Sequence, residues 1–492
     1  MAAQTEFELR LRRWDTPGDA SRVRSLWIDE ALQADATLAA PLGEDARCDV
    51  CIVGGGFTGL WTALRLREQS PSLSVMILEA DFCGAGASGR NSGGVGSWWG
   101  KLSTLIRLLG EEDAVRVLRA SNAAVQDIEA FVTQVGIECE LRRGPAVWSA
   151  TARAQLGAWE GAFKAAAQVG LDPPWRRLDA TQLQDLVGNA GPWLGGVVDD
   201  RALRVQPALL ARGLQREVLR QGVVIHERTP VSQIRGAPSG LQVRTQAGHV
   251  VACDRVVMAA NAWMAHLPQF RPHIAVLSSE IVATAPIPEI LADRGMRRRP
   301  GGINSRLMLN YGGITPRGQV YLGRGGGSIA FRAHVGAQFD HSARQLAEVE
   351  DDFRFLYPEL RDVPIARGWS GPIDRSMTGL PWFGELPGCA RVHYAIGYSG
   401  HGVGASALGG RILASRVLGR RDEWSALADV FLRARRGHFP PEPIRHIGGR
   451  LVRNAVARKE RAEREGRPPA RVDVLLSRFA PGTISDFRSR KA

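Results

Sequence analysis

The sequence predicts an α/β fold (α+β overall) in which one domain is split along the chain and a second, mainly antiparallel-sheet domain is inserted into it. Two strand–turn–helix units, at residues 48–79 and 391–418, lie at opposite ends of the main body. Between them, residues 273–370 alternate short apolar runs with glycine clusters, which is typical of antiparallel strands. Because the two units share one design, we expect them to meet in a single domain.

The elements follow in order from hydrophobic periodicity and from glycine and proline positions. Residues 1–45 resemble a polar arm with one short amphipathic helix near residues 23–32. Further helices are expected at residues 57–68, 112–136 and 206–221, and a hairpin at residues 241–253. The predicted segments are the arm (1–45), the split domain (46–136, 201–263 and 371–420), the inserted domain (137–200 and 264–370) and a basic C-terminal extension (421–492).

Composition narrows the class of protein. The chain has 492 residues, 44% of them hydrophobic, which is enough to bury a large core. No apolar run is long enough to span a membrane, and no apolar segment follows the basic N-terminus, so we expect a cytoplasmic protein without a membrane partner. The net charge is +13, but no nucleic-acid recognition module accompanies it, so we expect no nucleic-acid partner.

The six cysteines do not form a pattern typical of a metal or redox site. Cys48 and Cys51 form a C-x-x-C, but they lie on a predicted strand, where side chains three positions apart point to opposite faces. We therefore expect buried core thiols that do not pair. The spacing of cysteines and histidines predicts no metal site.

The first motif is Gly54-Gly55-Gly56-Phe57-Thr58-Gly59, a G-x-G-x-x-G between a strand and a helix. Gly54 permits the tight turn, Gly56 lets the backbone approach a pyrophosphate, and Gly59 lets the helix pack on the strand. Phe57 and Thr58 begin that helix, whose N-terminus attracts phosphate. Glu79 ends the next strand, where a carboxylate binds ribose hydroxyls and repels a 2′-phosphate. This Rossmann-like pattern serves FAD and NAD equally.

The second motif, residues 396–404, again joins a strand to a helix, and it favours FAD. No acidic strand end follows it, so a second nicotinamide site is disfavoured. A helix N-terminus here can face the pyrimidine edge of a flavin, where negative charge develops on reduction. The expected flavin-binding residues are Gly397, Gly400, His401, Gly402 and Val403.

These residues resemble the superfamily of FAD-dependent D-amino-acid oxidases and sarcosine/glycine oxidases, and most closely its gamma-glutamylputrescine oxidoreductase branch. The resemblance spans about residues 46–420. It is carried by the dinucleotide unit, a glycine-rich loop at residues 86–94, a late strand and turn at residues 369–381, and residues 397–402.

The resemblance implies an FAD domain with a substrate domain packed over the flavin. It also implies oxidation of the C–N bond of a small-molecule amine by hydride transfer to flavin N5, with hydrolysis of the imine and reoxidation of the flavin by oxygen or another electron acceptor. The additional cofactor contacts that it implies are Arg90, Asn91, Ser92, Val231 and Gly371.

The chain departs from the sarcosine oxidase pattern at three points. No cysteine occurs in the run before Thr378, so we expect non-covalent FAD. No lysine lies between Lys164 and Lys459, so an oxygen-activating lysine is not expected there, and His401 or Arg324 is a substitute cation if oxygen is the acceptor.

Third, Gly404 stands where a lysine holds the substrate carboxylate in those oxidases. A larger amine or amino-acid derivative is therefore favoured over a small α-amino acid. Arg306 or Arg332 is a candidate to hold it.

Four residues are candidates for catalysis, each with a structural alternative. His401 begins a helix, whose dipole favours the neutral imidazole, and it is either a base or a flavin contact. Tyr398 and Tyr311 have hydroxyls that orient an amine. Trp98, in the pair Trp98-Trp99, forms either an aromatic wall beside the flavin or part of the core.

Three other functions stay open from sequence. A flavin monooxygenase or halogenase shares the first motif, although Gly397-Tyr398 replaces the Gly-Asp that this class usually has. A flavoprotein acting on nucleic acid is suggested by the basic tail, and a non-catalytic FAD-binding subunit by hetero-oligomeric relatives. We expect the extension after residue 440 to form an amphipathic helix around residues 449–465 and to wrap the surface or to mediate a homo-oligomer.

Overall fold

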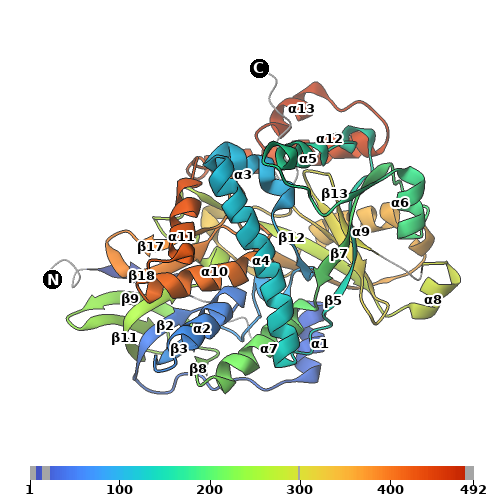
Figure 1. Cartoon of the computed structure of the whole chain (residues 1–492). Helices are drawn as coiled ribbons and strands as arrows, with labels where there is room; N and C mark the ends of the chain where they lie inside the picture. Colours follow the sequence, from blue (N-terminus) through green and yellow to red (C-terminus); the bar gives the residue numbers. More distant parts are fainter. Residues whose placement is uncertain (1–6, 14–22, 297–299, 482–492) are drawn as a thin grey trace.

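The computed structural model describes residues 7–13, 23–296 and 300–481, and its strands form two sheets (Figure 1). The predicted α/β class is confirmed. Strands of the first sheet come from residues 8–78, 224–258 and 382–396, and strands of the second from residues 94–204 and 274–376. The two sheets therefore alternate along the chain, as an inserted domain requires.

The first sheet has a parallel centre with antiparallel strands added. Strand β2 pairs in parallel with β11 and β3, β3 with β8, and β11 with β18. The strands are β1 (Glu8–Arg10), β9 (Val231–Ala237), β10 (Gly240–Thr245), β11 (Val250–Met258), β2 (Ala46–Val53), β3 (Val75–Leu78), β8 (Val224–His226), β18 (Cys389–Ile396) and β17 (Trp382–Leu386). Parallel strands need both faces covered, and the run Val50 to Val53 is accordingly buried.

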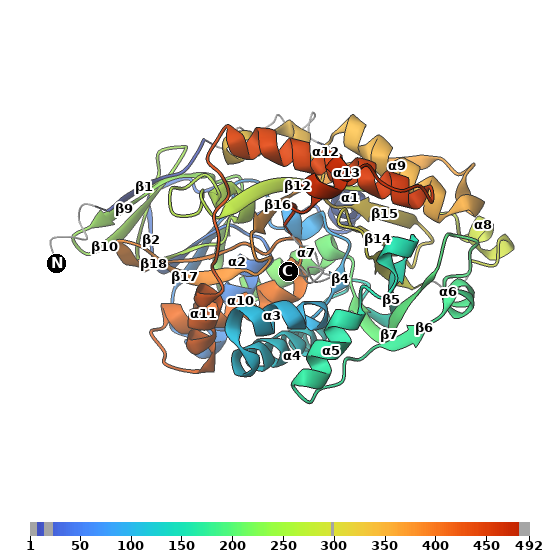
Figure 2. The same cartoon turned by 90° about the horizontal axis from the view of Figure 1, so that it is seen from above.

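Helices from both ends of the chain cover one face of this sheet (Figures 1 and 2). They are α2 (Phe57–Gln69), α3 (Leu102–Leu109), α4 (Glu111–Val135), α7 (Pro207–Arg220), α10 (Gly402–Val417) and α11 (Glu423–Arg433). A Cβ at Gly410 of α10 would lie 2.7 Å from the Cβ of Trp61 of α2. This glycine therefore allows the two helices that follow the glycine motifs to pack in direct contact.

The second sheet is antiparallel except where β13 runs parallel to β5. Its strands are β16 (Ile365–Ser376), β12 (Ile274–Thr284), β15 (Val320–Arg324), β14 (Asn310–Ile314), β13 (Gly301–Asn304), β5 (Arg142–Ala150), β7 (Gly195–Arg204), β4 (Gly94–Val95) and β6 (Arg176–Leu178). The helices of this region are α5 (Glu160–Gln168), α6 (Ala180–Val187), α8 (Pro288–Asp293) and α9 (Ala343–Leu356). Val349 and Phe353 of α9 are fully buried against this sheet.

The N-terminal arm is part of the body of the protein. Helix α1 (Leu26–Ala34) lies close to the predicted position and buries Trp27 against Tyr321 and Trp369. Strand β1, which the sequence did not predict, pairs with β9 at the edge of the first sheet. The arm therefore stabilises both sheets.

The two cysteines of the C-x-x-C contradict the prediction that they face opposite sides. Cys48 and Cys51 lie in the same buried cluster, and contacts with Cys253 and Cys48 and burial raise the pKa of Cys51. The backbone N–H groups of Asp49 and Val50 both donate to the carbonyl oxygen of Ser74, so the hydrogen bonding of β2 is irregular between the two cysteines. All six cysteines are buried and unpaired.

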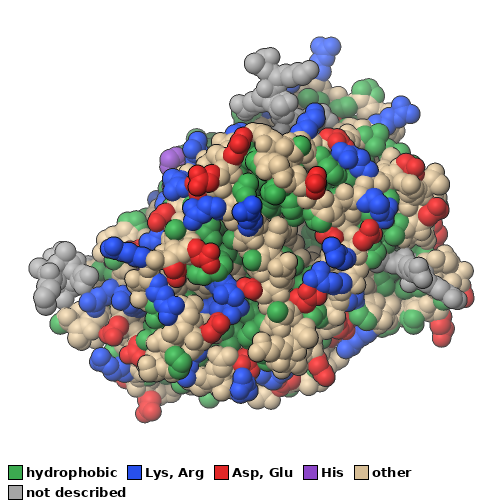
Figure 3. Space-filling view, in the orientation of Figure 1, with side chains coloured by type: hydrophobic (Ala, Val, Ile, Leu, Met, Phe, Trp, Pro, Cys, Tyr) green, Lys and Arg blue, Asp and Glu red, His purple; other side chains and the backbone are tan. Residues whose placement is uncertain are grey.

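The C-terminal extension forms α12 (Ile444–Arg464) and α13 (Arg471–Ser477), which lie across the second sheet beside α9 (Figure 2). Helix α12 begins five residues before the predicted start at residue 449, so the pair Gly448-Gly449 does not end it. The face in Figure 3 carries Lys and Arg interspersed with Asp and Glu. Among residues 7–13, 23–296 and 300–481, no helix is long and apolar enough to cross a membrane, and no group of side chains is suited to a metal ion.

Candidate active site

Both glycine motifs line one cavity of about 2220 Å³ between the two sheets. Gly54 and Gly56 of the first motif lie on its wall, as do residues 398–404 of the second. The cavity continues to Tyr311 on β14 and to α12 of the C-terminal extension. Because small-ligand pockets typically measure about 300–1,000 Å³, this cavity has room for a dinucleotide and a substrate together.

The first motif has the close contacts that its glycines predict. Gly54 has a φ of 113°, and a Cβ there would lie 2.7 Å from the carbonyl oxygen of Ala259. A Cβ at Gly59 would lie 2.0 Å from the carbonyl oxygen of Gly54. Phe57 N–H donates to the Ser88 hydroxyl at 2.9 Å, which fixes the start of α2 to the glycine-rich loop. A side chain at Gly54 or Gly59 would displace the turn that lines the cavity.

Glu79 lies at the end of β3 on the cavity wall, as predicted. Its carboxylate accepts hydrogen bonds from Gly55 N–H at 2.6 Å and Asp81 N–H at 2.9 Å. Burial nevertheless raises its pKa to about 7. A ligand that donates hydrogen bonds to this carboxylate, as ribose hydroxyls do, would favour its ionised form.

Asp374, which the sequence analysis did not single out as a site residue, fixes the second motif. Its carboxylate accepts hydrogen bonds from Gly397 N–H at 2.5 Å and Ser399 N–H at 3.3 Å. Burial raises its pKa to about 6 despite these donors. Gly397 and Ser399 have φ values of 89° and 57°, so Asp374 stabilises a turn with left-handed backbone before α10.

Tyr398 joins the two motifs. Its hydroxyl lies 2.7 Å from the hydroxyl of Thr58, and its ring packs against Phe383 in the core. Burial raises the pKa of Tyr398. Because Thr58 holds its hydroxyl, Tyr398 connects α2 with the second motif. This is a structural role, the alternative to orienting an amine.

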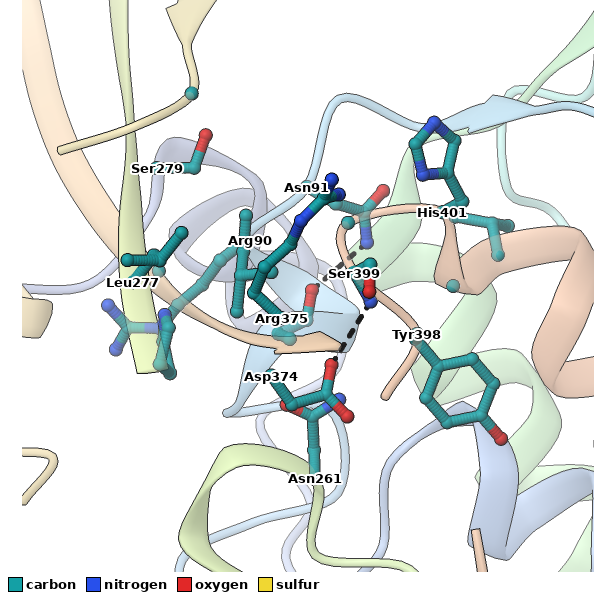
Figure 4. A pocket seen from close by; sticks show the side chains of 18 of the residues that line it. Arg90, Asn91, Asn261, Leu277, Ser279, Asp374, Arg375, Tyr398, Ser399 and His401 are labelled. Atoms are coloured by element: carbon teal, nitrogen blue, oxygen red, sulfur yellow. Dashed lines mark hydrogen bonds between the residues drawn. The ribbon is translucent and has the colours of Figure 1, made fainter. Parts of the chain in front are cut away.

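Two buried cations, Arg375 and Lys101, act on His401 at the N-terminus of α10. Arg375 and His401 are labelled in Figure 4. Burial lowers the pKa of Arg375 to about 10, and no described carboxylate offsets its charge. Its Nη2 atom is buried without a hydrogen-bond partner among the described residues, as is Nδ1 of His401. Burial, Lys101 and Arg375 together lower the pKa of His401 well below its usual range, so the imidazole is neutral at neutral pH.

Lys101 corrects the expectation drawn from the missing lysines. It is buried, and a Cβ at Gly379 would lie 2.8 Å from its Nζ. The lysine near the second motif thus comes from residue 101, outside the range 164–459 that the sequence analysis considered. Arg324, one of the suggested substitutes, pairs instead with Glu348 at 3.3 Å and Asp352 at 3.5 Å.

Hydrogen bonds and an ion pair fix the predicted contact residues of the glycine-rich loop. Arg90 donates to the carbonyl oxygens of Ala85 at 3.0 Å and Ser370 at 3.1 Å and pairs with Asp340 at 3.2 Å. Asn91 donates to Ser88 O at 2.9 Å and accepts from Gly93 N–H at 2.8 Å. Tyr321 donates to the carbonyl oxygen of Ser92 at 3.0 Å. All three line the cavity, as do Val231 and Gly371.

The aromatic wall is formed by Trp99, not by Trp98. Trp98 packs against Phe431 in the hydrophobic core and does not line the cavity, whereas Trp99 does. Of the two alternatives given for Trp98, the structure therefore shows the core position, because a short 3-10 turn at Trp99–Lys101 sends the two neighbouring rings in different directions. Tyr311 lies on the cavity wall as predicted, and its hydroxyl lies 2.7 Å from that of Ser279.

The two arginines suggested to hold substrate have other positions. Arg306 is buried between Asp352 at 2.8 Å and Glu460 at 3.1 Å. Arg332 is exposed and does not line the cavity. Arg375, by contrast, is buried with no carboxylate partner among the described residues, a difference that sequence alone does not show.

The architecture defines a class of protein. A dinucleotide turn, a second glycine motif with a cationic helix N-terminus, and an antiparallel sheet meet at one cavity, which is the design of a flavin-dependent oxidoreductase. The residues fit the cofactor: the glycine cradle accommodates a pyrophosphate, and Arg375 Nη2 is an unused donor that suits the carbonyl edge of a flavin.

Comparison with known proteins identifies the family. Residues 49–416 match the DAO family of FAD dependent oxidoreductases, and the chain belongs to it. FAD is its cofactor, and it is held without a covalent bond, since residues 374–378 contain no cysteine to form a flavin link.

Curated relatives and solved structures agree with this assignment. The chain is 28% identical to the gamma-glutamylputrescine oxidoreductase of Escherichia coli over 85% of this chain and 93% of that protein. It is 28% identical to the probable oxidoreductase OrdL of Haemophilus influenzae over 77% of this chain and 85% of that protein. The structure of glycine oxidase from Geobacillus kaustophilus superimposes with a TM-score of 0.63 at 22% identity, covering 77% and 96% of the two chains.

Proposed function

We propose that this protein oxidises the C–N bond of an amine or amino-acid derivative to an imine, which then hydrolyses. The observation that carries the proposal is the convergence of both glycine motifs on one cavity whose flavin end is cationic and whose remainder lies against the inserted sheet. FAD, when bound, supplies the hydride acceptor at flavin N5. The relatives named for gamma-glutamylputrescine and glycine support an amine as the substrate.

The residues of the chain have distinct roles in this proposal. Arg375 and the N-terminus of α10 would hold the pyrimidine edge of the flavin and favour negative charge there. His401, which is neutral, lines the same cavity. Tyr311 orients the amine through its hydroxyl, and Trp99 provides an apolar wall that excludes water. No strong base is required, because hydride leaves a neutral amine.

The test is anaerobic mixing of the holoenzyme with a panel of amines, scored by bleaching of the flavin absorbance. The proposal predicts that at least one amine with a C–H bond next to nitrogen bleaches the flavin and that the matched N-acylated compound, which has no basic nitrogen, does not. If photoreduction bleaches the flavin but no amine does, the protein is a non-catalytic FAD-binding subunit.

The electron acceptor is proposed to be oxygen, and the support is the buried cationic cluster of Lys101 and Arg375 beside the second motif. Positive charge near the flavin favours the transfer of electrons to oxygen, because superoxide is an anion. Stopped-flow mixing of the reduced enzyme with oxygen tests this. Reoxidation no faster than that of free reduced flavin would assign the enzyme to the dehydrogenases.

Self-association through the C-terminal extension is also proposed. Ile444, Ile447 and Leu451 recur on one side of α12 and are between 56% and 60% exposed, an apolar stripe that suits a partner helix. Sedimentation of the wild type and of the variant Ile447→Glu/Leu451→Glu decides it. An unchanged sedimentation coefficient would remove the idea.

A further inference from the structure

Helix α12 lies outside the matched residues 49–416, yet it forms one wall of the cavity. Its cavity-lining residues include Gly448, Gly449, Val452 and Val456. Figure 2 shows α12 lying across the second sheet, near β12 and β15. The extension therefore belongs to the site as well as to the surface.

A buried carboxylate fixes the C-terminal half of α12. Glu460 accepts hydrogen bonds from the backbone N–H groups of Leu307 at 2.5 Å and Met308 at 3.2 Å, and it pairs with Arg306 at 3.1 Å. Arg306 is held in turn by Asp352 of α9 at 2.8 Å. Since Leu307 and Met308 themselves line the cavity, this contact joins the helix directly to a neighbouring part of the cavity wall.

Two further ion pairs fix the helix to α9. Arg453 pairs with Glu348 at 2.5 Å and donates to the carbonyl oxygen of Gly326 at 3.1 Å. Arg464 pairs with Asp351 at 2.7 Å. At the other end of the contact, a Cβ at Gly449 would lie 2.9 Å from Cδ1 of Ile329, so the backbone of α12 packs closely on the sheet. The helix is thus a fixed wall.

Of the charged residues of α12 that line the cavity, Arg453 is used by these pairs, and Arg445 donates to the carbonyl oxygens of Pro440 and Ile274. The valines of the same wall add an apolar surface. Val452 and Val456 face the cavity from α12, and Leu307, Met308 and Ile303 face it from the sheet. A Cβ at Gly448 would meet no atom within 4 Å, so open space borders the helix there. An uncharged, apolar ligand group fits such a space, because a charged group would lose hydration without gaining a partner.

We infer that α12 determines the length of the amine that the enzyme accepts: the space beside Gly448 and Val452 receives an apolar arm of the substrate. This inference rests on the proposed oxidation of an amine and deepens it by naming the substrate class, an amine with an extended apolar substituent. Val452 and Gly448 are then specificity-determining residues of the enzyme.

The test uses the holoenzyme under anaerobic conditions and a series of primary alkylamines from propylamine to decylamine. Binding is read from the perturbation of the flavin spectrum, and flavin reduction is recorded separately. The wild type is expected to bind each longer amine about fourfold more tightly per added methylene until the cavity is filled. Because binding is measured independently of reduction, a failure of amine oxidation is distinguishable from a failure of this inference.

Gly448→Phe fills the open space, and Gly448→Ala is its matched control. The phenylalanine variant is expected to bind decylamine at least tenfold more weakly while its affinity for propylamine stays within twofold of the wild type. The alanine variant is expected to match the wild type in both affinities, and the better helix propensity of alanine should maintain or raise its Tm.

Val452→Ala provides a second variant that removes volume. It is expected to move the length of tightest binding to a longer amine, which holds even if Gly448→Phe fails to fold. The inference is overturned if wild-type affinity is independent of chain length, if no alkylamine perturbs the flavin, or if the variants change the affinity for all lengths equally.

Discussion

Replacing Arg375 by methionine should stabilise the protein without FAD and weaken its binding of FAD. The guanidinium is buried with no described carboxylate to offset it, and burial lowers its pKa from its ordinary value to about 10. Methionine has a similar length without the charge. The two effects have opposite signs because FAD provides the partner that the free protein lacks.

The magnitude follows from the pKa. A base whose pKa is lower in the folded state than in the unfolded state is penalised wherever it stays protonated, so the penalty is complete below about pH 10 and disappears as the pH rises above the ordinary pKa of arginine. At neutral pH the difference corresponds to about 3 kcal/mol, an upper value because a buried charge attracts water. Losing a hydrogen bond from a charged donor weakens FAD binding by about 1.5–3 kcal/mol, or roughly tenfold to a hundredfold.

Urea unfolding of apoprotein and fluorescence titration with FAD measure the two quantities for wild type, Arg375→Met and Arg375→Lys. The lysine variant keeps a charge and should lie between the other two in both measurements. The reasoning is refuted if Arg375→Met lowers the stability of the apoprotein by more than about 1 kcal/mol and leaves the affinity for FAD unchanged, since Arg375 would then be a packing residue.

Three further predictions test other parts of the site. FAD affinity of the wild type should rise between pH 6 and pH 8, because burial raises the pKa of Glu79 to about 7 and the carboxyl must ionise to accept the ribose hydroxyls. Glu79→Gln should abolish this rise. Calorimetry in buffers of different ionisation heat should show proton release in the wild type alone. Thr58→Val should lower the free energy of unfolding by about 1–2 kcal/mol, and adding Tyr398→Phe should lower it little further. Urea unfolding measures both variants. If the two substitutions lower the free energy of unfolding additively, the hydroxyls of Thr58 and Tyr398 are not hydrogen bonded. Trp99→Phe should change the KM for amines and leave Tm nearly unchanged, while Trp98→Phe should lower Tm alone; the reverse result would restore Trp98 to the substrate wall.

The fold was predictable because its signals are local and periodic. The strand before Gly54, the helix after it and the glutamate ending the next strand are one continuous pattern, and residues 396–404 repeat its design. The edge strand β1 was missed because three residues carry too little periodicity. The start of α12 was predicted five residues too late because Gly448-Gly449 resembles a helix boundary. In the structure Gly449 packs closely on Ile329, and Gly448 borders open space.

The cofactor cradle was also predictable, but the chemistry around it was not. Asp374 acts across 23 residues of chain on Gly397, and no motif marks a single aspartate at the end of a strand as a turn anchor. Arg375 differs from Arg306 only in lacking a carboxylate nearby, which depends on tertiary packing. Lys101 could not be assigned to the second motif from sequence, because only folding brings that distant segment close to it.

The account depends on a single FAD being held by both glycine motifs at once. Titration of the apoprotein with FAD, followed by absorbance and by Tm, tests this directly in the wild type and in two variants, Gly59→Val in the first motif and Asp374→Ala beside the second. The account predicts one FAD per wild-type chain, a rise in Tm on binding, and loss of binding in both variants. A wild-type protein that FAD neither binds nor stabilises, or full binding after disruption of either motif, would contradict it.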